Sequence, residues 1–126
     1  MPRAELRLNL SALGSIRREV MDASLETVSA LRGEVITAQV MPFNTGDMQN
    51  NHTAVQQRAD GDDIYTSLVT DTPYARKMYY HPEYNFQTVN NPNAQGLWLS
   101  SWLPGGDKES FLPDTFHLKL RARLSK

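Results

Sequence analysis

Asp71-Thr72-Pro73-Tyr74-Ala75-Arg76-Lys77-Met78-Tyr79-Tyr80-His81, here called the joint, holds three of the five tyrosines, a proline and two adjacent cations. Proline lacks an N–H and fixes its own φ, so the strand-like run before Pro73 should end or bend here. Tyrosine side chains are large, stiff and amphipathic, and they suit a packed joint or a protein–protein contact. The joint contains no nucleophile with an adjacent base. The sequence therefore predicts a structural element around which the other segments are arranged.

The segments before the joint have the periodicities of one helix and three strands. Residues 4–10 alternate between apolar and polar side chains, which predicts a half-buried strand. Apolar residues recur every three or four positions across 15–41, which predicts one long amphipathic helix that Pro42 should stop. Gly33 lowers helix propensity there and indicates a kink or a close approach of another segment. Two more strands are expected at 53–59 and 64–70, and residues 60–63 should form the hairpin turn between them.

The segments after the joint are less regular. Residues 81–93 are polar and rich in asparagine, which is typical of a long loop. In Leu97-Trp98-Leu99-Ser100-Ser101-Trp102-Leu103 the two tryptophans lie one helical turn apart, and we expect them in the core. Pro104-Gly105-Gly106-Asp107 then breaks the chain. Residues 116–124 alternate strictly, which predicts a final strand with one apolar and one basic face.

These segments predict an α+β fold in a single domain, residues 1–126. We expect one long amphipathic helix packed on a small, mainly antiparallel sheet with long loops. The first and last predicted strands have matching patterns, so they should belong to the same sheet. A chain of 126 residues is long enough for one modest core, and its 40% apolar and 21% charged residues are typical of a globular protein.

Composition also limits the possible functions. The formal net charge is −1, so nothing draws the whole chain towards nucleic acid or an anionic membrane. The sequence has no cysteine, which excludes a disulfide framework, a thiolate nucleophile and a cysteine metal site. No apolar run approaches the ~20 residues of a membrane span, and the N-terminus has no signal-peptide core. We therefore expect no membrane partner.

The candidate chemical groups are few. The three histidines, at positions 52, 81 and 117, lack the close spacing of a metal site on one element. His81 near Glu83 could form an acid–base pair, although an exposed loop histidine is the simpler interpretation. The acidic run at 60–63 lacks the later glycine and glutamate of a calcium loop. We expect no catalytic, cofactor-binding or metal-binding residues and no cofactor; a small enzyme using His81 and Glu83 stays as a third hypothesis.

The predicted last strand offers one feature that could contact nucleic acid, a basic face formed by Lys119, Arg121 and Arg123. Three cations on an edge strand more often prevent aggregation or pair with a neighbouring subunit. Aromatic residues between them, which single-strand binders use, are missing. A small nucleic-acid-binding module is therefore the alternative from another class, and it predicts salt-sensitive binding that weakens when these cations are replaced by alanine.

Three short motifs resemble one known family. Pro42-Phe43-Asn44-Thr45-Gly46-Asp47-Met48, directly after the long helix, is similar to the Pro-x-x-Thr-Gly-x-Leu segment of tailed-phage neck proteins, the minor capsid or tail-completion proteins of the head–tail junction. The joint resembles their strand followed by Pro-Tyr-Ala and aromatic residues. Asn91-Pro92-Asn93-Ala94 before Trp98 is similar to their later Asn/Pro/Ala-then-Trp segment. The family usually closes with a helix, whereas this sequence predicts a Pro/Gly-rich stretch and a basic strand.

The resemblance implies a virion structural protein of the phage neck, made in the host cytoplasm. It implies a homo-oligomeric ring, hexamer or dodecamer, around a channel through which DNA passes without sequence recognition, with neighbouring connector and tail proteins as partners. A tail terminator ring is the alternative within this class. The family implies no catalytic residues. Candidate subunit-interface residues lie on the joint and on the charged helix face: Tyr74, Arg76, Tyr79, Tyr80, Arg17, Arg18 and Glu26.

Overall fold

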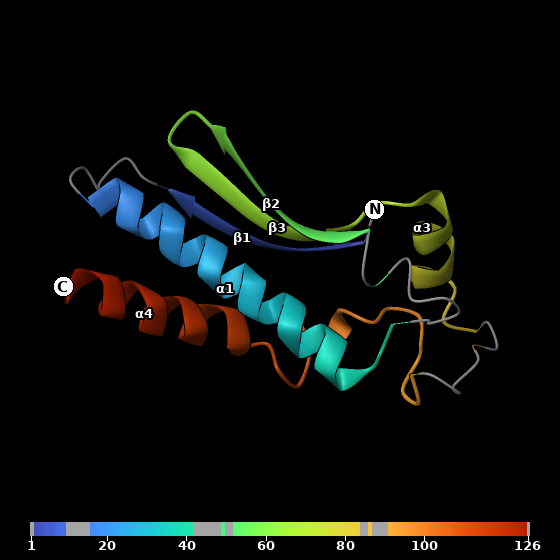
Figure 1. Ribbon diagram of the computed structural model, residues 1–126. Helices are drawn as coiled ribbons and strands as arrows, with labels where there is room; N and C mark the ends of the chain where they lie inside the picture. Colours follow the sequence, from blue (N-terminus) through green and yellow to red (C-terminus); the bar gives the residue numbers. More distant parts are fainter. Residues whose placement is uncertain are drawn as a thin grey trace.

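The computed structural model describes residues 2–9, 16–41, 49, 52–83, 86 and 91–125. The elements follow in the order β1 (Arg3–Asn9), α1 (Arg17–Ala38), β2 (Thr53–Asp60), β3 (Asp63–Thr70), α3 (Pro73–Tyr79), a short 3-10 helix (Ser100–Trp102) and α4 (Phe111–Leu124). The fold is α+β, as the sequence predicts (Figure 1). The motif at 42–48 and positions 84–85 and 87–90 of the expected loop lie outside the described residues.

Three antiparallel strands form the sheet, in the order β1-β3-β2. The hairpin between β2 and β3 turns at Gly61, whose φ of 63° suits glycine. The apolar residues of β1 face the helix side of the sheet, where Ala4 is fully buried in the same cluster as Leu68 of β3. The three strand predictions before the joint, and the hairpin prediction, are therefore confirmed.

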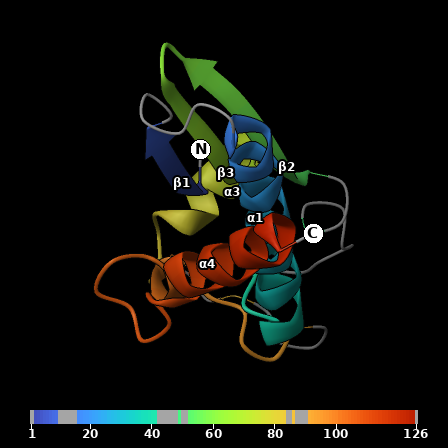
Figure 2. The same cartoon turned by 90° about the vertical axis from the view of Figure 1, so that its left-hand side faces the viewer.

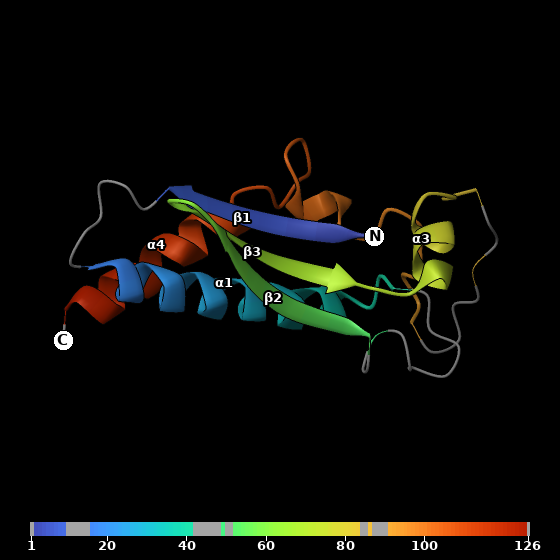
Figure 3. The ribbon, with the colours of Figure 1, turned by 90° about the horizontal axis from the view of Figure 1, so that it is seen from above.

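α1 is the long helix, and it covers one face of the sheet (Figures 1 and 3). It ends at Ala38, slightly earlier than predicted, because Gln39 takes the left-handed conformation and donates its N–H to the Ile36 carbonyl. A methyl group at Gly33 would meet no atom of another described segment within 4 Å, so the expected close approach there is wrong. The buried side chains recur every three or four positions, as predicted: Val20, Ala23, Ser24, Thr27, Val28, Leu31 and Val35.

A buried polar network joins α1 to the sheet. Ser24 and Thr66, both fully buried, share a hydrogen bond of 2.9 Å between their hydroxyl oxygens. The Gln57 amide nitrogen lies 3.0 and 2.9 Å from these two oxygens and 3.1 Å from the Met21 carbonyl oxygen, so its two N–H groups are shared among three acceptors. Buried polar groups cost free energy when they are unpaired. The network therefore favours a single register of α1 on the sheet.

The C-terminal segment is a helix, so the predicted strand at 116–124 is wrong, and so is the expectation that it shares a sheet with the first strand. α4 packs against α1 on the side away from the sheet (Figures 1 and 2). Leu112 is buried in the main core cluster, and Phe116 and Leu120 pack against the second buried cluster, around Val20. These three residues recur every four positions, which is a helical spacing. Contact with α1 selects this periodicity over the alternating one.

The expected basic strand face does not form. Positions two apart on an α-helix differ by about 200°, so on α4 Arg121 points away from the side shared by Lys119 and Arg123, and the three cations form no common face. Arg121 is exposed, whereas Arg123 turns towards α1 and pairs with its acidic residues. The feature that motivated the nucleic-acid-binding alternative is therefore missing from the folded chain.

Candidate interaction surface

The joint contains the short helix α3, which begins where β3 has just ended. The Ala75 N–H donates to the Thr72 side-chain oxygen at 3.0 Å, and Pro73 stands in the first turn, where its missing N–H is harmless. The predicted break in the strand is therefore confirmed. The helix itself was not predicted, although Thr-Pro is a recognisable helix start.

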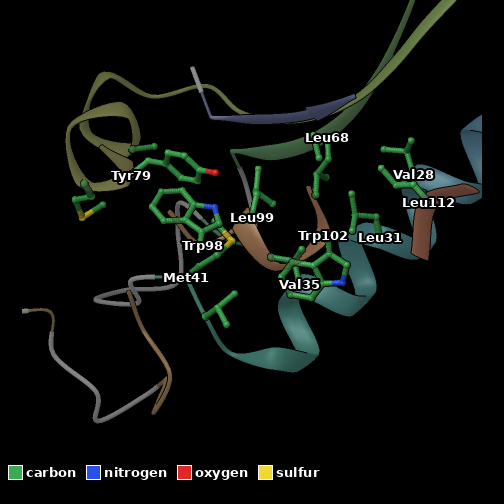
Figure 4. Close-up of a cluster of buried hydrophobic side chains, with 14 residues drawn as sticks. Val28, Leu31, Val35, Met41, Leu68, Tyr79, Trp98, Leu99, Trp102 and Leu112 are labelled. Carbon is green, nitrogen blue, oxygen red and sulfur yellow. The ribbon is translucent and has the colours of Figure 1, made fainter. Parts of the chain in front are cut away.

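The adjacent tyrosines at the end of α3 point in different directions. Tyr79 is 5% exposed and its ring packs edge-on against Trp98, with ring centres 4.8 Å apart. Figure 4 shows Tyr79 beside Trp98 within the main buried cluster. Tyr80 is 55% exposed, and its ring still contacts the Tyr79 ring at 5.1 Å. The exposed tyrosine is therefore held in place by the buried one.

The burial of Tyr79 should make the stability of the fold depend on pH in the alkaline range. Burial, and secondarily the neighbouring Tyr80, raises the pKa of the Tyr79 hydroxyl, while a backbone hydrogen bond with Leu99 opposes the shift. A raised pKa favours the neutral form, so this stabilisation is full below the unfolded value of about 10 and is lost as the pH rises through the folded value. We expect the wild type to lose more stability above about pH 10 than a Tyr79→Phe variant. Denaturant unfolding at a series of alkaline pH values tests this; two parallel profiles would contradict it.

Leu97 adds a second exposed apolar side chain close to the end of α3. Its φ is 49°, a left-handed conformation that is strained for a leucine, and its N–H donates to the Tyr79 carbonyl at 2.8 Å. The preceding Gly96 lies so close to the end of α3 that an added Cβ would stand 2.7 Å from Pro82 Cα. Strain of this kind persists only where the surroundings enforce it, and it is often found at functional positions.

Four exposed residues lie on α3 or close to its end, and we call them the joint patch: Tyr80, Leu97, Arg76 and Lys77. Arg76 and Lys77 are exposed and lie one helical turn before Tyr80, on the same side of α3. Leu97 is 39% exposed. An aromatic ring, a leucine and two cations are residues typical of a protein–protein contact, and the rigid backbone beneath them presents a preformed surface.

Two further exposed leucines lie on α4, and we call them the α4 patch: Leu118 and Leu124, six residues apart, with the exposed Arg121 between them in the sequence. Leu118 is 62% exposed and Leu124 is 48% exposed. The Arg121 guanidinium lies 2.9 Å from the ring of His117. The α4 patch and the joint patch lie towards opposite ends of the molecule (Figure 1).

An ion-pair cluster holds α4 on α1. One Arg123 nitrogen lies 2.5 Å from a Glu26 oxygen, and the other lies 3.5 Å from an Asp22 oxygen. The hydrogen bond with Glu26 is the largest cause of a raised pKa for Arg123. Glu26, a predicted interface residue, therefore faces the chain's own α4. Arg17 and Arg18 are exposed at the start of α1, and the side chain of Tyr74 lies outside the described residues.

His81 and Glu83, the candidate acid–base pair, lie on the surface of the described part of the chain. His81 and Glu83 do meet, at 2.8 Å, and the hydrogen bond from His81 lowers the pKa of Glu83, but the two side chains are 46% and 65% exposed. An acid–base pair this open to water resembles an ordinary surface contact. Within the described ranges, no three histidine or acidic side chains gather in a way that could hold a metal ion. Of the described helices, none is long and apolar enough to span a membrane.

Comparisons of the chain with protein-family models, with curated proteins and with solved structures found no match. The described residues form an α+β subunit with two sets of exposed apolar side chains, the joint patch and the α4 patch.

Proposed function

We propose that this chain is a virion structural protein of a tailed phage. It forms a ring in the neck, in the head–tail connection or in tail completion, around the DNA channel; a tail terminator ring is the alternative within this class. The observation that carries the proposal is the presence of two exposed apolar patches, the joint patch and the α4 patch, towards opposite ends of one subunit. A subunit placed between two different neighbours needs two different adhesive surfaces.

The C-terminal helix adds support. The resemblance to neck proteins was incomplete because a strand was predicted where that family has a helix. α4 follows the tryptophan segment, as the closing helix of the family does. The joint likewise has the expected order of strand, proline turn and aromatic residues, with Tyr79 packed on Trp98.

The mechanism would be mechanical. Copies of the chain form a homo-oligomer, hexamer or dodecamer, and the two patches dock the ring onto a connector protein on one side and a tail protein on the other. DNA passes through the lumen without sequence recognition, and a formal net charge of −1 suits a wall that does not grip phosphates. Such a protein is made in the host cytoplasm and ends in the virion neck.

Native mass measurement and a virion reconstruction test this proposal. We expect the purified chain to form a closed ring at micromolar concentration, or to appear as a ring between head and tail in the virion. A chain that is monomeric in solution and missing from particles would refute the proposal. Turnover of a substrate dependent on His81 and Glu83 would favour the enzyme hypothesis instead.

Tyr80→Ala tests the joint patch. Because Tyr80 is 55% exposed, the variant should keep its fold, with a stability loss of about 1 kcal/mol or less. If Tyr80 is a contact residue, truncation should weaken docking by about 30-fold, since tyrosines at interface centres contribute about 2 kcal/mol. Co-sedimentation with particles that lack this protein measures the docking. Asp107→Ala, an exposed change in the turn before α4, is the control; equal docking of both variants would rule out the joint patch.

A further inference from the structure

Among the described strands, β1 and β2 are the two edges of the sheet, and α1 packs on only one of its faces. β1 and β2 each pair with β3 on one side only, and of the described strands no other extends the sheet. α1 covers one face, while Figure 3 looks onto the opposite face, on which Ser67 and Val69 of the central strand are buried and Arg7 and Arg58 of the two outer strands carry charge. An unpaired edge presents a row of N–H and C=O groups that can pair with another chain. The two edges are the most complete unused binding surfaces of the described chain.

We propose that neighbouring copies of this chain join edge to edge, with β1 of one copy pairing with β2 of the next. This inference rests on the proposed ring and names the contact that would close it. β1 and β2 both run antiparallel to β3, so they run parallel to each other. A β1-to-β2 contact is therefore a parallel, head-to-tail pairing, the kind that builds rings, whereas pairing β1 with β1 under two-fold symmetry would be antiparallel and would stop at a dimer.

The charged side chains of β1 and β2, on the sheet face opposite α1, favour one register for this contact. Within one chain, Arg7 of β1 and Arg58 of β2 both pair with Tyr65 of β3, so the two arginines lie at the same position along the strand direction. A neighbour added without stagger would place Arg7 beside Arg58, which is a like-charge contact. A shift by two residues keeps every side chain on its own face of the sheet and removes that contact.

The shifted register matches opposite charges. It puts Glu5 of one copy beside Arg58 of the next, and Arg7 beside Asp60. A stagger between neighbouring strands is also what a sheet needs in order to close on itself. The edges are thus complementary in charge when β1 of one copy is offset by two residues so that Glu5 lies beside Arg58 of the next copy.

Within one subunit these charged side chains already make contacts, which the edge contact with a neighbouring copy would replace or extend. Arg7 pairs with Asp63 at 2.9 Å, and Arg58 lies over the Tyr65 ring at 4.0 Å from its centre. Glu5 pairs with Arg3 at 3.3 Å and accepts a hydrogen bond from Ser67. Both arginines of these ion pairs are exposed, and Glu5 can keep its hydrogen bond from Ser67 while it contacts Arg58 of the next copy.

The absence of cysteine from the sequence makes crosslinking a direct test. In a Glu5→Cys, Arg58→Cys variant the two thiols of one chain are separated by β3, about 10 Å across two strand spacings, which is too far for a disulfide. Under mild oxidation we expect a ladder of multimers that ends at the ring size. The control is a Glu5→Cys, Arg18→Cys variant, whose second cysteine is exposed on α1 and not on a strand edge. This variant should give no ladder of multimers.

Charge reversal gives an independent readout. Arg58→Glu and Glu5→Arg should each abolish the oligomer peak in native mass measurement, and the double variant should restore it, with thermal unfolding used to confirm that each variant is folded. Dimers from Glu5→Cys alone would overturn the proposal in favour of two-fold pairing. If a ring forms in every variant, the edge contact is wrong, while the proposed ring function is unaffected. If the wild type never assembles, in solution or on particles, both the edge contact and the ring function are wrong.

Discussion

Trp98→Ala is expected to lower the free energy of unfolding by about 3–5 kcal/mol, a large share of the ~5–15 kcal/mol typical of a domain. Trp98 is 1% exposed, and its indole packs between the joint and the main core cluster (Figure 4). Truncation would leave a cavity and would also remove the edge-on contact with Tyr79, which is worth about 0.5–1.5 kcal/mol by itself. Urea denaturation followed by circular dichroism measures the loss.

Leu118→Ala is the matched control, because it also truncates a large apolar side chain, but one that is 62% exposed on α4. Its effect on stability should be within about 0.5 kcal/mol. A Trp98→Ala variant that unfolds at the same urea concentration as Leu118→Ala would show that the joint is not anchored in the core. The joint patch would then lose its rigid support.

The first strand and the long helix were predictable because each has a clear periodicity. β1 alternates at every position, and the buried side chains of α1 follow a stripe that recurs every three or four residues. The strands β2 and β3 were predictable from the hairpin turn between them and from the β-branched and aromatic residues of β3. Burial of the two tryptophans was predictable from composition alone, since large aromatic residues among leucines are seldom left in water. The sequence placed Tyr79 and Tyr80 together among the candidate interface residues; the structure leaves only Tyr80 exposed and buries Tyr79 against Trp98.

The C-terminal helix was not predictable from its pattern, because that pattern fits two structures. Phe116, Leu118 and Leu120 alternate like a strand, while Leu112, Phe116 and Leu120 follow a helix. The choice depends on α1, which supplies an apolar face and the acidic partners of Arg123. Leu97 could not have been singled out either, since its left-handed backbone is imposed by contacts with the end of α3.

Gly106→Ala is expected to lower the free energy of unfolding by about 3 kcal/mol, at the upper end of the usual range for overpacking. An alanine Cβ at this position would stand 2.2 Å from the Ser100 carbonyl oxygen and 2.4 Å from that of Ser101. These oxygens cannot simply move away, because they accept hydrogen bonds from Leu103 and Lys108 (3.3 and 2.7 Å). The conflict involves backbone on both sides, so no side-chain rotation relieves it.

Gly33→Ala makes the same substitution in an exposed interior position of α1, where the added methyl group meets no neighbour. It should raise stability by about 0.5–1 kcal/mol, since alanine is the better helix former. The opposite signs of these two changes separate a packing conflict from a general effect of glycine removal.

The turn at Gly106 leads directly into α4, so Gly106→Ala should also weaken the packing of that helix. Hydrogen exchange in α4 should then accelerate more than in β3. Equal protection of α4 in the variant and the wild type would mean that the turn does not position the helix that carries the α4 patch.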